Sequence, residues 1–220
     1  MIDIKFFVKG FTSIRGVGSP AIALGASFVA IGALLKNLGF SIQESIFSTF
    51  LTYALPGSLV MAESMFIGAT VLNIFVAVWL VNARLYPMTV SLMPLLMHKS
   101  QPRWKYYLSC HFIAVSSWLI MKDNYENIKK ENRIDFWIGI GTATWSVAII
   151  STVIGFIASD YLNKDILIGL AIINPIYFIC MMIGAMKTIQ ISVSVVLGAI
   201  LGPTFYFLSP EWCILFGGFI

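Results

Sequence analysis

The residues of this sequence best suited to chemistry are polar or ionisable side chains placed inside apolar stretches. The leading one is Arg84, in VNARLYP, with Asn82 two residues before it and Pro87 three residues after it. An arginine at the centre of a membrane helix costs about 2.5 to 3.5 kcal/mol to insert, so one that is retained there often marks a solute pathway. Arg84 could hold a carboxylate in an interior cavity. The alternative is that Arg84 lies at a membrane interface and extends toward lipid headgroups.

A second group of polar residues surrounds a Pro-Gly pair in the segment TYALPGSLVMAE. Tyr53, Ser58 and Glu63 flank Pro56 and Gly57. Because proline removes a helical hydrogen bond, we predict a discontinuous helix here. The backbone groups that such a break frees are able to bind a solute or an ion. An ordinary packed kink is the alternative interpretation.

Three further residues complete the candidate site. Asn174 precedes Pro175 in the middle of an apolar run, where a freed carbonyl and the amide side chain would suit a solute, although the pair favours a structural kink over a ligand site. His111, together with Glu63, is a candidate proton carrier, and its alternative is a polar residue at the membrane interface. Trp145 lies deep in GIGTATWSVAII, as a core residue or as a lining of the cavity. We predict that Asn174 and Trp145 belong to the substrate-binding group.

Several classes of chemistry lack their usual residues. The sequence has no GxSxG elbow, HExxH pair, phosphate-binding loop or dinucleotide fingerprint, and no paired carboxylates within an apolar run. Cys110, Cys180 and Cys213 are far apart and have no CxxC spacing, so no zinc site or disulfide framework is indicated. The net charge of +4 comes from scattered loop residues, not from a basic stripe that nucleic acid would need. We predict no enzymatic activity, no cofactor, no metal and no nucleic-acid partner.

The elements that position these residues follow from the composition. The 220 residues are 59% hydrophobic and only 11% charged, and the mean hydropathy is +0.89. A soluble domain carries roughly 25% charged residues, so this surface must face lipid. A spanning helix takes about 20 apolar residues, and the apolar stretches provide for about 6–8 of them. We predict an all-α, polytopic transmembrane bundle with some segments broken by proline or glycine, forming one membrane-embedded domain over residues 1–220.

The apolar runs give the order of these segments. They are residues 21–35, 46–62, 66–81, 85–97, 106–121, 136–158, 166–186 and 189–208. Basic residues precede the first run and occupy residues 98–105, which the positive-inside rule places in the cytoplasm. The polar loop 122–135 is also basic. If residues 106–121 cross the membrane, that loop falls on the opposite side, so one of these assignments must give way.

The order of these features resembles the AzlC family, the large subunit of bacterial branched-chain amino acid exporters. The likeness rests on a Gly-rich first span, a second span broken at a small-residue turn, and VNARLYPMTVSLMPLL. Asn82, Arg84, Leu85 and Tyr86 fall on the corresponding positions of the family motif. Ser58 stands where the family has a glutamine, a departure that bears on substrate identity. The likeness extends from Gly10 to about Pro203.

The resemblance implies a multi-pass permease subunit of the bacterial inner membrane. Such a subunit exports a small amino acid-like solute, branched-chain amino acids in this family, together with a small hydrophobic AzlD-type membrane subunit. A different class of function, a non-transporting scaffold or regulatory partner, predicts that Asn82, Arg84 and Asn174 lie in loops or interfaces. Both a monomer and a homo-oligomer fit the sequence.

Overall fold

The computed structural model describes residues 3–15, 20–66, 68–83, 85–161 and 189–208, and a few single positions between 163 and 179. The chain divides into two compact units, residues 1–174 and 175–220, and each is described by itself. In the second unit, helix α11 (Ile189–Leu208) forms over the last predicted apolar run. The prediction of a single domain stays a prediction.

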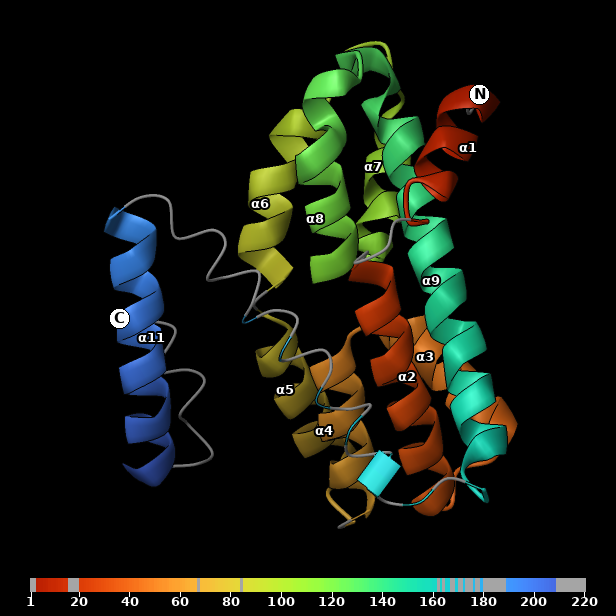
Figure 1. Cartoon of the computed structure of the whole chain (residues 1–220), viewed down its shortest axis with the longest axis vertical. Helices are drawn as coiled ribbons and strands as arrows, with labels where there is room; N and C mark the ends of the chain where they lie inside the picture. The colour runs from red at the N-terminus through yellow and green to blue at the C-terminus, as the bar shows by residue number, and fades with distance from the viewer. Residues whose placement is uncertain are drawn as a thin grey trace. The chain divides into compact units, whose positions relative to one another are not determined.

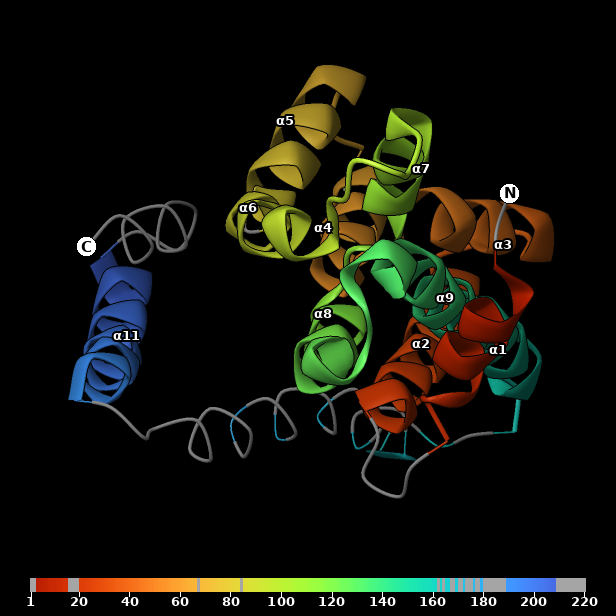
Figure 2. The ribbon, with the colours of Figure 1, turned by 90° about the horizontal axis from the view of Figure 1, so that it is seen from above.

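The first unit is built on two long helices that lie side by side and run in the same direction, α2 (Pro20–Asn37) and α9 (Arg133–Ala158) (Figures 1 and 2). Glycines bring their backbones together. A Cβ at Gly32 would overlap the backbone of Thr152, and one at Gly155 would overlap the backbone of Val29. Small residues permit such close approach between membrane helices, where dispersion contacts replace the hydrophobic effect.

Helix α1 (Ile4–Thr12) packs on the first turns of α9 in the same way. Gly10 lies against the backbone of Phe136, and Gly139 of α9 lies against the backbone of Phe7. The basic residues of α1 are thereby held at the end of the unit where α9 begins.

Helices α3 (Ile42–Thr52) and α4 (Leu55–Phe66) form a hairpin that enters the unit and returns. Tyr53, between them, has a φ of 33° in the left-handed region, which ends α3 and turns the chain. Along α4, Ala62 then packs with Leu35 at the end of α2, close to where α3 begins. The second predicted span is therefore a re-entrant hairpin. Its break falls at Tyr53, earlier than the predicted break at the Pro-Gly pair.

Helix α7 (Arg103–Ser109), a 3-10 turn at residues 110–112 and helix α8 (Val115–Asn124) form a second hairpin. The prediction of one span over residues 106–121 is wrong. The cause is the extended residue Ala114, whose N–H is accepted by the Ser117 hydroxyl at 3.0 Å while that hydroxyl donates to the Phe112 carbonyl at 2.6 Å. The hydroxyl satisfies backbone groups that a continuous helix would pair internally.

Between the hairpins, α5 (Val71–Asn82) and α6 (Leu85–Leu96) form a pair bent by 49°. Pro87 lies in the first turn of α6, where a missing N–H costs little, and the helix continues through Pro94. The prolines therefore do not break this segment, and the interruption falls after Asn82.

Two helices are long and apolar enough to cross a membrane, residues 20–37 and 130–158, and the bent pair α5–α6 makes a third if it is one span. The described residues thus contain two or three candidate spans, and the larger predicted number stays a prediction. The order is span, hairpin, bent span, hairpin, span.

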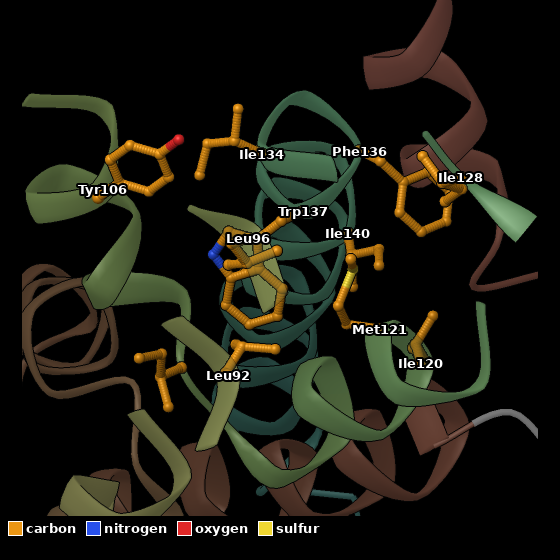
Figure 3. Close-up of a cluster of buried hydrophobic side chains, with 11 residues drawn as sticks. Leu92, Leu96, Tyr106, Ile120, Met121, Ile128, Ile134, Phe136, Trp137 and Ile140 are labelled. Atoms are coloured by element: carbon orange, nitrogen blue, oxygen red, sulfur yellow. The ribbon is translucent and has the colours of Figure 1, made fainter. Parts of the chain in front are cut away.

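A buried apolar cluster fixes the end of the unit where α7 and α9 begin. Figure 3 shows Trp137 and Ile140 of α9 among Leu92 and Leu96 of α6 and Met121 of α8, all of them fully buried. This cluster holds the second hairpin against α6 and α9, so its turn is carried toward the middle of α9.

Candidate functional site

The turns of the two hairpins meet near the midpoint of α9. Tyr53 from the first turn and Ala114 from the second belong to one buried cluster with Phe28 of α2 and Ala148 of α9, and Trp145 packs against it. Discontinuous helices that meet at the level of the bilayer midplane are the usual construction of a transporter binding site. We take this meeting point as the candidate site.

The turn of the first hairpin exposes the backbone carbonyl of Phe50, one of the last carbonyls of α3. It accepts a hydrogen bond from Nε2 of His111 at 3.0 Å and one from Nε1 of Trp145 at 3.3 Å. Because a carbonyl can only accept, Nε2 of His111 carries a proton in this arrangement.

Aromatic rings lie beside this carbonyl. Phe50 and Trp145 meet edge to face with centroids 4.7 Å apart, and Tyr53 stacks on Phe28 at 6.4 Å. The His111 ring lies 6.2 Å from both Tyr53 and Trp145. The rings give the site apolar walls beside a few polar groups, which is the usual composition of a small-molecule pocket.

Asn82 and Ser58 form the polar part of the site. The Asn82 side chain lies directly on Gly57, where an added Cβ would come within 2.5 Å of its amide nitrogen, so only glycine fits. Ser58 is 1% exposed. Neither the Ser58 hydroxyl nor Oδ1 of Asn82 has a hydrogen-bond partner among the described residues.

Two more hydroxyls are buried in the same hairpin without a hydrogen bond in the described part of the chain, those of Ser48 and Tyr53. Tyr53 is 2% exposed. An unsatisfied buried polar group costs about 1 to 3 kcal/mol. Three of the four groups are hydroxyls of the first hairpin, and the fourth is on the Asn82 side chain that packs on Gly57 of this hairpin, so a polar ligand that reached them would satisfy them.

The structure places six of the predicted residues in two adjoining groups. Tyr53, His111 and Trp145 lie together, and Asn82 lies on Gly57, which is next to Ser58 and four residues after Tyr53. Pro56 is the second residue of α4, and Glu63 lies two turns further along it. Arg84 and Asn174 lie outside the described residues. No cluster of metal-ligating side chains occurs in the ranges that the structure describes.

Sequence reasoning missed a buried ion pair between α7 and α9. Lys105 and Asp135 are 2.8 Å apart, with side chains 0% and 2% exposed. Lys105 also donates to Gln101, at 2.9 Å, and Asp135 accepts the N–H of Asp3, at 3.1 Å. The sequence predicted that Lys105 and Asp135 lie in solvated loops, because each stands at the edge of an apolar run. Nothing in the sequence indicates that they pair.

A model of the AzlC protein family matches residues 20–162, which is more than half of the chain. The chain belongs to the AzlC family. This family consists of helical membrane proteins of amino acid transport and is not an enzyme family. No curated protein and no solved structure matches the chain.

The AzlC match begins at the first residue of α2 and ends just after α9. It therefore contains both hairpins, the bent pair and the whole candidate site. Helices α1 and α11 lie outside it.

Proposed function

We propose that this chain forms the transport pathway of a secondary transporter in the bacterial inner membrane. It exports a small amino acid-like solute, in keeping with the branched-chain amino acids of the AzlC family. The observation that carries the proposal is that buried hydroxyls of the first hairpin and the amide oxygen of Asn82, which packs on it, have no hydrogen-bond partner among the described residues.

The polar ends of an amino acid match the groups of this site. Arg84, two residues after Asn82, or the first turn of α4 holds the carboxylate. Leu55 and Gly57 supply backbone N–H groups there, and the positive end of the helix dipole favours an anion. Ser58, Tyr53 and the Asn82 oxygen accept hydrogen bonds from the amino group. The apolar side chain of the solute then lies against the aromatic rings.

The two hairpins supply the movement that alternating access needs. The bond from His111 to the Phe50 carbonyl joins their turns, Trp145 of α9 donates to the same carbonyl, and both bonds can be exchanged without unfolding a helix. His111 is the candidate for coupling to protons, because its ring lies at the turn of the second hairpin and bonds to the turn of the first. Glu63 is the second candidate.

The orientation follows from the second hairpin. Because residues 106–121 return to the end where they started, the loop 98–105 and the stretch 122–135 lie at the same end, joined by the bond from Gln101 to the Glu131 carbonyl at 2.9 Å. The basic residues of α1 lie there too. We propose that this end is cytoplasmic, as the positive-inside rule requires. We also propose an AzlD-type small subunit as the partner.

The test is accumulation of labelled amino acids in cells that lack or overproduce the protein, with and without the small subunit. Overproduction should lower accumulation of branched-chain amino acids. Arg84→Gln should abolish the effect at equal protein level, whereas Lys129→Gln, an equal loss of charge in an exposed loop, should not. Unchanged accumulation of every amino acid would favour the scaffold function.

Coupling to protons needs its own measurement. Export should slow when the proton gradient is collapsed, and the pH dependence of export should be lost in His111→Gln. A rate that is indifferent to the gradient would exclude His111 and Glu63 as carriers while leaving the export proposal intact.

A further inference from the structure

A groove with a volume of about 660 Å³ runs along the outer side of α7, beside the end of α6. It extends from Lys99 and Arg103, at the basic end of the unit, to Cys110 at the turn of the second hairpin. The seven residues of α7 correspond to roughly 10 Å of helix, so the groove covers about a third of a bilayer's apolar thickness.

The two ends of the groove differ in chemistry. Lys99 and Arg103 are exposed at its basic end, and none of the residues that line it is acidic. Met93, Met97 and Tyr107 supply apolar surface along its length, and Tyr107 is 78% exposed. A ligand that fits must carry negative charge at one end and hydrocarbon at the other.

The lining of the groove includes none of the residues of the candidate site. Tyr106 closes its inner side, because this ring is 6% exposed and its hydroxyl accepts the N–H of His98 at 3.0 Å. On the outer surface of the same helix, Trp104 and Leu108 are 55% and 67% exposed, as expected of a helix that meets lipid headgroups and acyl chains.

We propose that this groove binds an anionic phospholipid, whose headgroup phosphate contacts Lys99 and Arg103 and whose acyl chain lies along Met93 and Met97. Basic pockets between helices at the cytoplasmic face of membrane proteins suit such lipids. The site is separate from the transport pathway, so it stands or falls independently of the export proposal.

The thiol of Cys110 reports on the groove. In a variant with Cys180→Ser and Cys213→Ser it is the one cysteine of the chain. The full-length variant in lipid nanodiscs is treated with a maleimide, and the labelling rate is followed as phosphatidylglycerol replaces phosphatidylcholine. The labelling rate should be lower in nanodiscs that contain phosphatidylglycerol than in nanodiscs of phosphatidylcholine alone.

Lys99→Gln with Arg103→Gln should raise the phosphatidylglycerol content needed for half-maximal protection by roughly thirtyfold, since each basic side chain near an anionic surface contributes about fivefold. Lys129→Gln with Lys130→Gln removes the same charge from exposed positions and should leave protection unchanged. Lys99→Gln alone serves if the double variant does not fold.

Three results would overturn the proposal. Equal labelling rates in the two lipids would show that no anionic lipid binds there. Equal protection by inorganic phosphate in phosphatidylcholine would assign the groove to a free anion. Protection by an added branched-chain amino acid would make it a vestibule for the solute.

Discussion

The candidate site contains polar atoms that cost stability where they stand. The hydroxyl of Ser58 is buried, and no described residue bonds to it, whereas the hydroxyl of Thr49, in the same hairpin, bonds to Thr152 at 3.0 Å. A protein retains an unsatisfied group when a ligand or a conformational change uses it. The two hydroxyls therefore allow function and stability to be separated by matched substitutions.

Ser58→Ala should reduce export while leaving the protein as stable as before, or more stable by about 1 kcal/mol, because the desolvation penalty disappears. Thermal unfolding in detergent and accumulation of labelled leucine measure the two effects. Thr49→Val is the control. It should cost about 1 kcal/mol of stability, the value of one lost hydrogen bond, and retain export per folded molecule. Full export by Ser58→Ala would remove Ser58 from the site.

At the scale of single residues, the side chains of the candidate site could be predicted from the sequence, but its free backbone carbonyl could not. Ser58, Asn82 and His111 are polar residues within or beside apolar runs, and the structure places them near the hairpin turns. The sequence did not indicate the Phe50 carbonyl, because a free carbonyl depends on where a helix ends and not on residue type. Tyr53 ends that helix in a conformation that a non-glycine residue rarely adopts, so no pattern signalled it.

The elements of this fold are held together by close backbone contact and by a buried ion pair. Gly155 is the clearest case of contact, because its Cα faces the backbone of Val29 and the neighbour cannot move aside as a flexible side chain would. Helix α9 meets α2 through this contact. Any added atom must separate the two helices.

Gly155→Ala should destabilise the protein by about 3 kcal/mol or prevent its accumulation, since overpacking a close contact costs 1 to 3 kcal/mol and this one involves backbone. Gly198→Ala in α11 is the matched control, because no residue that the structure describes in the second unit lies within 4 Å of its added Cβ. It should be neutral or stabilising, as alanine favours a helix over glycine. Detergent-extracted yield and unfolding temperature report both. Equal yields of the two variants would contradict the packing described for Gly155.

Asp135→Asn should be more damaging than its small change of shape suggests. It leaves the charge of Lys105 buried without its carboxylate, which costs about 3 to 5 kcal/mol. Adding Lys105→Met to Asp135→Asn should restore much of the loss, because the remaining amide still accepts the N–H of Asp3. Unfolding temperatures of the three proteins measure this. If the double variant is no more stable than the single one, the charge is not the cause.

The bounds of the long helices could be predicted from the lengths of the apolar runs. The two hairpins could not be predicted in this way. Residues 21–35 and 136–158 were predicted as spans and form α2 and most of α9. Residues 106–121 have the same apolar character but turn back, because a single serine, Ser117, pairs the backbone groups of the break. A hydropathy window averages the hydrophobicity of its residues, so it cannot detect a turn that depends on one side-chain hydrogen bond.

In the first unit, the described helices repeat one order twice: α2 is followed by the first hairpin, and the bent pair is followed by the second hairpin, which enters from the opposite end. Helix α9 comes after the second of these pairs. The same order in opposite directions is that of the inverted repeats by which transporters expose one site to two sides in turn. The return of the second hairpin to the end where it began also removes the conflict between the basic loops.

Cysteine labelling tests this topology. Lys99→Cys and Lys129→Cys, in a chain without its native cysteines, should both react with an impermeant maleimide from the cytoplasmic side. Gln43→Cys, at the start of α3 and exposed, should react from the other side. Reaction of Lys99→Cys and Lys129→Cys from opposite sides would mean that residues 106–121 cross the membrane.

The tryptophans of α9 have a consequence for how the protein is made. Trp145 donates to the Phe50 carbonyl of the first hairpin, and Trp137 donates to the Ser109 carbonyl of the second at 3.2 Å. The first of these partners is 95 residues away along the chain. At 5 to 20 residues per second, the ribosome delivers Trp145 about 5 to 19 seconds after Phe50. Until His111 and then Trp145 arrive, the first hairpin has a turn carbonyl that lipid cannot satisfy, so the insertion machinery must shelter this turn.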